Sequence, residues 1–166
     1  DSLKEVNISD LSAWCKIDFG DNCSNPLCYA KTFKLNGTEI TDLVIPNDIT
    51  QIKRAAFRGF TSLTSVTIPN SVSSIGEYAF YDCTGLTSIT IPNSVTSISS
   101  SVFQNCSGLN EVNISDLSAW CKIDFKGSTS NPVYYANSLK LNGTEITDLV
   151  IPNDISQIKD YAFIGC

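Results

Sequence analysis

Hydrophobic and polar positions repeat along this chain every 23 residues, as the spacing of Pro69 and Pro92 shows. In the unit 63–85, Val66 and Ile68 alternate with small polar residues, which is the period of a β-strand. The proline that follows cannot donate a ladder hydrogen bond, so it ends the strand. A second, weaker extended piece comes next, and a glycine then precedes apolar residues at helical spacing. Each unit therefore predicts a strand, a turn, a short extended piece and a short helical turn.

One unit cannot bury its own apolar side, because it has too little chain to cover it. Stacked units would cover one another, which is the principle of a solenoid. The pattern predicts a repeat solenoid with short parallel β-strands on one wall and short helical turns and loops on the other. The apolar positions of two consecutive units are Leu63, Val66, Ile68, Val72, Ile75, Ala79 and Phe80, then Leu86, Ile89, Ile91, Val95, Ile98, Val102 and Phe103.

A longer period contains the short one. The segment NISDLSAWCKIDF stands at residues 7–19 and again, unchanged, at residues 113–125, an interval of 106 residues. That interval equals one unit of 37 residues and three units of 23 residues. We therefore expect one solenoid over residues 1–166 that is a fragment of a longer array. Its expected parts are a long unit 1–39, short units 40–62, 63–85 and 86–108, a long unit 109–145 and a partial short unit 146–166.

The long unit begins like a short one and then departs from it. Asp10 can cap a short helix that places Leu11, Trp14 and Cys15 on one face. Further on, an Asn-Gly pair between apolar alternations predicts a β-hairpin with a two-residue turn. We expect this hairpin to protrude from the coil wall once in every four turns. Trp14 recurs as Trp120, which favours a core role for both over ligand binding.

These motifs resemble the BspA-like class of leucine-rich repeats. LTSVTIPNSVSSIGEYAFYDCTG, at residues 63–85, has its L-x-x-[VI]-x-I-P-x-S-V-x-x-I pattern, with Phe and Cys following. SAWCKIDF, NPLCYA and LNGTEITDLVIP are similar to the long variant unit of that class. The resemblance covers essentially the whole chain and implies a solenoid of the leucine-rich-repeat type, with a hairpin inserted in the long units. Ser71 and Ser94 stand where the conventional repeat carries Asn. The resemblance further implies a secreted or surface protein for adhesion or protein binding, with no enzyme activity and no named ligand.

Composition narrows the function classes. The net charge of −6 disfavours nucleic acid, which selects basic faces. The chain has no His, so no Ser–His or Cys–His pair can form. Carboxylates such as Asp18 and Asp42 have no convincing partner carboxylate in the sequence. We therefore expect no enzyme, no metal site and no cofactor. No apolar run approaches the roughly 20 residues of a membrane span.

The seven cysteines fall into two groups. Most of them occupy repeat positions and are expected to be buried thiols: Cys15, Cys83, Cys106, Cys121 and Cys166. Cys23 and Cys28 differ, because the second copy replaces both together, with Thr129 and Tyr134. A local Cys23–Cys28 disulfide explains this joint loss better than two independent thiols, and it would indicate an oxidising compartment.

Asn-x-Ser/Thr triplets suggest glycosylation if the source is eukaryotic. The alternative, which we favour without a known source, is that a chain rich in Ser, Thr and Asn forms such triplets by chance. The candidate acceptors are Asn7, Asn22, Asn36, Asn105, Asn113 and Asn142.

Outward strand positions form the candidate contact wall. They are mostly small hydroxyl residues, which suit either a solvated sheet face or a partner surface. We expect an extracellular or cell-surface protein that binds a protein or glycan partner for adhesion. The alternative is a structural filament or stalk built by head-to-tail self-association. The wall residues are Thr64, Ser65, Thr67, Thr87, Ser88, Thr90, Asn110 and Glu111.

Overall fold

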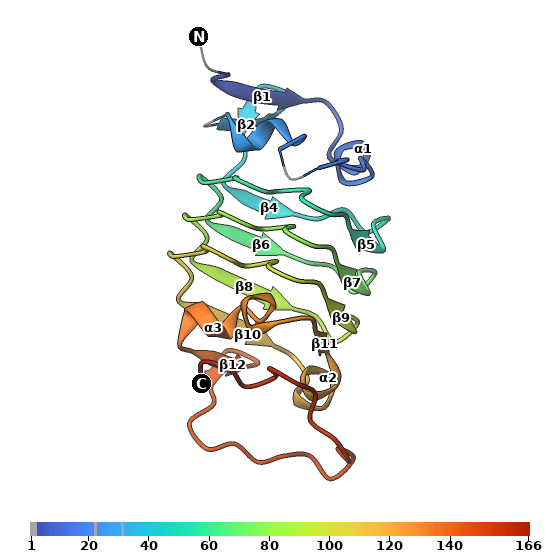
Figure 1. Cartoon of the computed structure of the whole chain (residues 1–166), viewed down its shortest axis with the longest axis vertical. Coiled ribbons are helices and arrows are strands. Elements are labelled where there is room, and N and C mark those ends of the chain that lie inside the picture. Colours follow the sequence, from blue (N-terminus) through green and yellow to red (C-terminus); the bar gives the residue numbers. More distant parts are fainter. Residues whose placement is uncertain (1–2, 22, 31) are drawn as a thin grey trace.

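The computed structural model describes residues 3–21, 23–30 and 32–166. Successive units stack along the long axis of the molecule, and their strands lie one beneath another (Figure 1). The predicted solenoid of the leucine-rich-repeat type is therefore confirmed. The main wall consists of β4 (Asp42–Val44), β6 (Ser65–Thr67), β8 (Ser88–Ile91), β10 (Glu111–Ile114) and β12 (Leu139–Leu141), all parallel, and β13 (Thr144–Glu145), which is antiparallel to β12.

The 23-residue period fixes the register of this wall. Ser65 pairs with Ser88, Val66 with Ile89, and Thr67 with Thr90. Side chains alternate between the two faces of a strand, so equal positions of successive units point the same way. Val66 and Ile89 are buried and the Thr pair is exposed. The sequence pattern thus becomes one apolar inner row between two polar outer rows.

A second parallel sheet forms from the weaker extended piece of each unit. Its strands pair in register, as at Ile75 and Ile98, and both of these side chains are fully buried. The predicted second extended piece is confirmed. The strands are β5 (Gln51–Ile52), β7 (Ser74–Ile75), β9 (Ser97–Ile98) and β11 (Asp124–Phe125).

The segment after each glycine forms consecutive hydrogen-bonded turns instead of the expected helical turn. Tyr78 and Asp82 have φ of 59°, a left-handed conformation that a helix cannot contain. Their amides donate to the carbonyls of Ser100 and Gln104 in the next unit, at 3.3 and 3.0 Å. Backbone groups on this side are therefore satisfied between units, as in a sheet.

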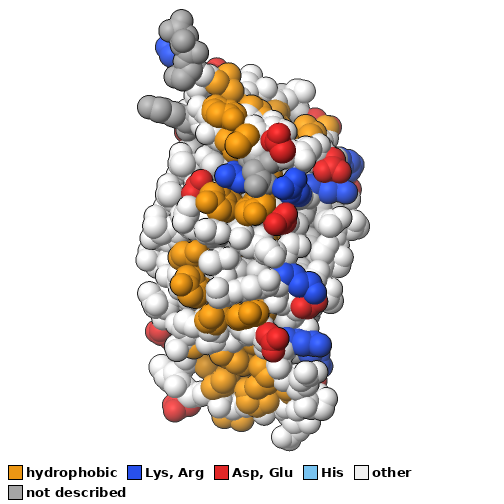
Figure 2. Space-filling model, in the orientation of Figure 1, with side chains coloured by type: hydrophobic (Ala, Val, Ile, Leu, Met, Phe, Trp, Pro, Cys, Tyr) orange, Lys and Arg blue, Asp and Glu red, His pale blue; other side chains and the backbone are white. Residues whose placement is uncertain are grey.

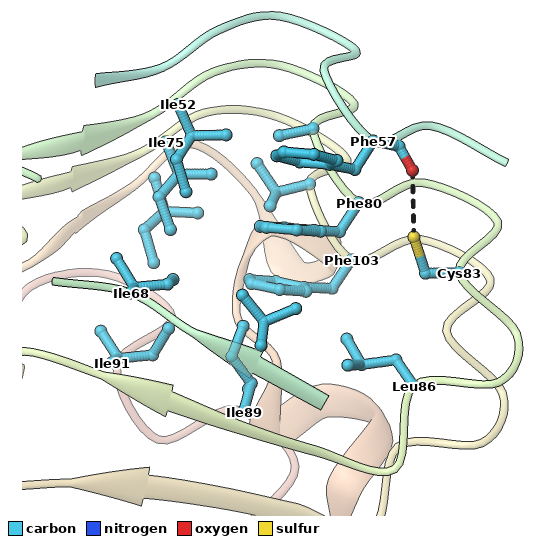
Figure 3. Close-up of a cluster of buried hydrophobic side chains, with 14 of the residues drawn as sticks. Ile52, Phe57, Ile68, Ile75, Phe80, Cys83, Leu86, Ile89, Ile91 and Phe103 are labelled. Atoms are coloured by element: carbon cyan, nitrogen blue, oxygen red, sulfur yellow. Dashed lines mark hydrogen bonds between the residues drawn. The ribbon is translucent and has the colours of Figure 1, made fainter. Parts of the chain in front are cut away.

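Identical side chains stack in the core along the coil axis. The rings of Phe57, Phe80 and Phe103 lie nearly parallel, with centroids 5.6 and 5.8 Å apart (Figure 3). Cys83 Sγ lies 3.2 Å from the carbonyl oxygen of Phe57, and Cys106 Sγ lies 3.1 Å from that of Phe80. These two cysteines are buried, as expected, and each thiol satisfies a carbonyl of the preceding unit.

Serine hydroxyls also link the turns. Ser71 Oγ donates to the carbonyl of Ile49 at 2.8 Å, and Ser94 Oγ donates to that of Val72 at 2.7 Å. A hydroxyl at this position reaches a main-chain carbonyl of the preceding unit. The serines at the conventional Asn position therefore make inter-turn hydrogen bonds.

Buried side chains of each long unit contact the unit that follows it. The indole nitrogen of Trp14 donates to the carbonyl of Ala56 at 3.0 Å, and that of Trp120 donates to Ala162 at 2.8 Å. Both tryptophans are buried, so their expected core role is confirmed. Asp10 accepts from the Ala13 amide, as its capping role predicts. The helices here are α1 (Leu11–Cys15), α2 (Leu117–Lys122) and α3 (Val133–Ala136), with 3-10 turns η1 (Pro26–Cys28) and η2 (Ser128–Ser130).

The predicted hairpins are present, but their first strands do not protrude. β2 (Thr32–Leu35) pairs in parallel with β1 (Glu5–Ile8), and β12 pairs in the same way with β10. Only the second strands, β3 (Thr38–Glu39) and β13, run antiparallel. The expected protrusion was wrong because the first hairpin strand carries Phe33 or Leu139, which are buried in the core. The second long unit thus adds β10 and β12 to the main wall, whereas β1, β2 and β3 of the first long unit form a separate three-stranded sheet.

The partial unit 146–166 is less buried than its first copy. Leu149 and Ile158 are 44% and 42% exposed, whereas Leu43 and Ile52 are 1% exposed beneath the following unit. Cys166 is also exposed, so its expected burial was wrong. No later unit of the 166-residue chain covers these side chains.

Candidate contact surface

The wall residues predicted from the sequence lie together on the outer side of the main sheet. Asp42, Ser65, Ser88 and Glu111 form one row, because each pairs with the next across adjacent strands. A second row runs through Val44, Thr67, Thr90 and Asn113 by the same register. The outer side thus presents two parallel rows of side chains on a regular backbone.

The hydroxyls at the entry to each strand are held in place by the preceding unit. Thr64 Oγ1 donates to the carbonyl of Thr41 at 3.0 Å, and Thr87 Oγ1 donates to that of Thr64 at 3.0 Å. In the described part of the chain, Thr67 and Thr90 make no such side-chain bond. These two exposed threonines are therefore the wall groups best able to bond a partner.

Asp42 gathers three hydroxyls at one end of the first row. Its carboxylate accepts from Ser65, Thr64 and Thr41, and these hydrogen bonds hold its pKa below the ordinary value. A pocket of about 500 Å³ lies between Asp42 and the first hairpin. A catalytic acid there would need a raised pKa. Asp42 is instead an ionised group that fixes neighbouring hydroxyls.

Ion pairs flank the hydroxyl region in both copies. Lys34 Nζ lies 2.6 Å from Glu5 Oε2, and Lys140 pairs with Glu111 in the same way. Asn7 and Asn113 each accept the amide of the hairpin glycine at 3.0 Å. The wall therefore has a hydroxyl-rich centre between Asp42 at one end and the Lys140–Glu111 pair at the other.

The candidate disulfide residues lie at one pocket away from this wall. Cys23 and Cys28 line a pocket of about 380 Å³, and Cys23 is exposed. The structure has no bond between their sulfur atoms, and the pairing stays a prediction. Burial raises the pKa of the Cys28 thiol. Burial also raises the pKa of the Cys106 thiol, to about 12, which keeps that thiol protonated at neutral pH.

The glycosylation candidates differ in accessibility. Asn36 and Asn142 are exposed at the hairpin tips, with φ of 51°. Asn105 is exposed, but its amide donates to Asp82 at 2.8 Å. Asn113 Nδ2 donates to Glu111 at 2.9 Å, so a glycan on that nitrogen would compete with this contact. Asn7 is exposed, and Asn22 lies outside the described residues.

Sequence reasoning missed two features. The first is a pair of amides, Asn25 and Asn131, which are fully buried and bond to main-chain carbonyls of the next unit. Their recurrence before a proline was the available signal. The second feature is a cluster of Tyr78 and Tyr81 around Arg58. Nothing in a single unit indicates this cluster, because its members come from different units.

A family comparison agrees with this geometry. The model of the BspA type leucine-rich repeat region matches residues 29–166 in six copies. The chain belongs to this family. The BspA type comprises surface-located repeat proteins that are typically non-enzymatic. None of the curated protein sequences compared with the chain matches it.

Solved structures are similar to this chain over part of their length. A leucine-rich cell surface protein from Faecalibacterium prausnitzii A2-165 is 33% identical, with a TM-score of 0.47, over 55% of this chain and 22% of its own. The pneumococcal vaccine antigen PcpA is 17% identical, with a TM-score of 0.51, over 69% of this chain and 34% of its own. This BspA-type chain thus spans at most about a third of either relative. No helix within the described residues is long and apolar enough to cross a bilayer.

Proposed function

We propose that this BspA-type chain is an extracellular or cell-surface recognition module that binds a protein partner through the contact wall. The observation that carries the proposal is the pair of register-locked outer rows on the main sheet. A regular backbone holds these side chains without further ordering, so little conformational entropy is lost when a partner docks. Solenoid walls of this kind offer extended binding surfaces.

Binding of a partner should be most sensitive to substitutions at the centre of the wall. Thr67 and Thr90 are exposed and lie side by side in the second row, with Val44 63% exposed beside them. An interface core is depleted of charged residues. Lysines at Thr67 and Thr90 would place two ammonium groups in that core, which a docking protein would have to desolvate.

The experiment compares binding of wall and control variants to a panel of extracellular-matrix and serum proteins. Thr67→Lys/Thr90→Lys is expected to lose binding, while Asn70→Lys/Asn93→Lys keeps it. The control places the same charges on exposed turn residues of the same two units. No binding by the unmodified chain to any panel member, or equal loss in both variants, would count against the wall.

Self-association is the second candidate function. Leu43, the first-copy counterpart of Leu149, is buried beneath the unit that follows it. A second copy stacked head to tail would cover Leu149 in the same way, and such contacts do not close. Sedimentation velocity across a concentration series should then show species growing beyond dimers, and Leu149→Asp should abolish them. A monomer at all concentrations contradicts this candidate.

A further inference from the structure

The two long copies of this chain differ mainly in one region. Residues 3–60 align with residues 109–166, and many accessible positions are identical, such as Lys16 with Lys122 and Asp48 with Asp154. Isolated changes at accessible or partly buried positions lie elsewhere, at Lys4, Thr32 and Thr50. The clustered changes replace Gly20, Asp21, Cys23, Cys28, Arg54 and Arg58 by Lys126, Gly127, Thr129, Tyr134, Asp160 and Ile164. Drift alone would alter all exposed positions about equally, so this clustering marks a surface with its own chemistry.

Three of the changed residues of the first copy line one pocket. Cys23, Cys28 and Arg58 surround a space of about 380 Å³ together with Tyr29 and Asp82. Tyr29 is 58% exposed. We call this space the Arg58 pocket. It lies within the size range of small-molecule sites, which begins at about 300 Å³.

The guanidinium of Arg58 is held in place by two tyrosines from the next unit. It lies 4.4 Å from the ring centroid of Tyr81 and 5.5 Å from that of Tyr78. The two rings meet edge to face at 5.6 Å. Asn105 then bonds the Tyr81 hydroxyl and the Asp82 carboxylate. The cluster thus fixes a donor and an acceptor beside the pocket before any ligand arrives.

The fold itself does not require these tyrosines. Tyr78 has a left-handed backbone, which is unfavourable for a residue other than glycine. The equivalent positions one unit away hold Ala55 and Ser101, also left-handed, so a small side chain suffices there. Gln104 stands at the position equivalent to Tyr81. On the side of the molecule seen in Figure 2, hydrophobic side chains gather in patches beside charged ones.

The pocket chemistry selects one class of ligand. Arg58 would repel a cation and Asp82 would repel an anion, and an apolar ligand would strip water from both. Thr61 and Thr84 add hydroxyls to the lining, and each hydroxyl can donate and accept. A neutral molecule with several hydroxyl groups meets all these requirements. The exposed ring of Tyr29 offers an apolar face beside the polar groups.

We propose that the Arg58 pocket binds a neutral hexose unit of a glycan. Arg58 donates to the sugar hydroxyls, Asp82 accepts from them, and the Tyr29 ring packs against the C–H face of the sugar. Tyr78 and Tyr81 are positioning residues that hold the guanidinium. This site lies apart from the contact wall and is independent of the protein partner proposed for it.

The test uses the 166-residue chain and the methyl glycosides of glucose, galactose, mannose and N-acetylglucosamine, followed by an array of neutral oligosaccharides. Saturation-transfer NMR should detect at least one of these sugars on the chain. Arg58→Ile and Tyr81→Gln should each weaken binding by about tenfold, equivalent to about 1.4 kcal/mol. Both variants insert the residue that already occupies the equivalent position of another unit, so the fold should be kept.

The controls separate this site from the wall. Thr67→Lys/Thr90→Lys should leave sugar binding unchanged, even if it abolishes a protein interaction. Tyr29→Ala, on an exposed ring, should weaken sugar binding without changing the urea midpoint. Absence of binding to every sugar and oligosaccharide overturns the proposal. So does binding that survives Arg58→Ile unchanged, or an Arg58→Ile variant that loses only a protein partner.

Discussion

Buried amides hold the long units onto the coil at the residue scale. Asn25 donates to the carbonyls of Ala55 and Ala56 at 2.7 and 2.9 Å, and its own oxygen accepts from the Leu27 amide at 2.8 Å. Asn131 repeats these contacts in the second copy. One side chain therefore bonds three main-chain groups. The carbonyls of Ala55 and Ala56 also accept from the Arg58 amide and the Trp14 indole, whereas the Leu27 amide has no other acceptor among the described residues.

Asn25→Ala should destabilise the chain by about 1–3 kcal/mol, because the Leu27 amide would lose its acceptor and an unsatisfied buried group costs about 1–3 kcal/mol. The loss is measured as a lower midpoint in urea unfolding. Asn47→Ala is the control, since Asn47 is exposed and should change stability by less than about 0.5 kcal/mol. Equal midpoints for the two variants would show that the buried amide has no special role.

The cysteine pair gives a second prediction at this scale. Chain produced under oxidising conditions should carry a Cys23–Cys28 disulfide, because both thiols lie at one pocket and are replaced together in the second copy. Alkylation without reduction, followed by peptide mass spectrometry, should find residues 23 and 28 linked and Cys83 unlinked. Alkylated Cys23 and Cys28 in the native oxidised chain would contradict the pairing.

At the scale of elements, the first strand of each hairpin belongs to a parallel strand pair and is not an appendage. Phe33 on β2 is fully buried, with its ring centroid 4.9 Å from Trp14 and 5.3 Å from Phe60. Gly59 allows the backbone of η1 to lie close by, because a Cβ at that position would lie 2.9 Å from the Cα of Cys28. The hairpin turn reverses the chain only after β2 has paired with β1.

Phe33→Ala should therefore destabilise the chain by about 3–5 kcal/mol, the usual cost of removing a buried Phe. Thr38→Ala on β3 is the matched control, because Thr38 is exposed in the same hairpin. Thermal unfolding followed by circular dichroism measures both. If Phe33→Ala behaves like Thr38→Ala, the hairpin does not contribute to the core.

Across the whole molecule, surface carboxylates favour the folded state above the acid range. Hydrogen bonds from Lys16 and Ser12 lower the pKa of Asp48, and those from Lys122 and Ser118 lower that of Asp154. A pKa lower in the folded than in the unfolded state means that folding favours the ionised form. This stabilisation is present above the ordinary Asp value of about 3.9 and is lost as pH falls through the lower folded value.

Thermal unfolding midpoints should therefore fall steadily when the pH is lowered from about 5 to about 2. Asp48→Asn/Asp154→Asn should flatten part of that fall, since neither amide titrates. Adding salt should also reduce the fall of the unfolding midpoint with pH, but to a smaller extent, because these exposed ion pairs are screened by salt. A double variant with the pH profile of the unmodified chain would show that these carboxylates do not contribute.

The repeat period and the inward residues followed from the sequence alone. Val66, Ile75 and Phe80 recur every 23 residues, and equal residues at equal spacing stack only as a coil. The outer wall positions followed as well, since strand side chains alternate. These features are set by local spacing, so the linear pattern was sufficient.

The tertiary structure decided which segments of different units meet. β2 pairs with β1 instead of protruding, because Phe33 is buried between Trp14 and Phe60. Asn25 became an inter-turn hydrogen-bonding group, and Arg58 met Tyr81 of the following unit. Such contacts depend on how each turn sits on the next one. The sequence by itself determined the repeating coil. Only the stacking of units in three dimensions determined the contacts of Phe33 and Asn25 with neighbouring units, and the Arg58 pocket.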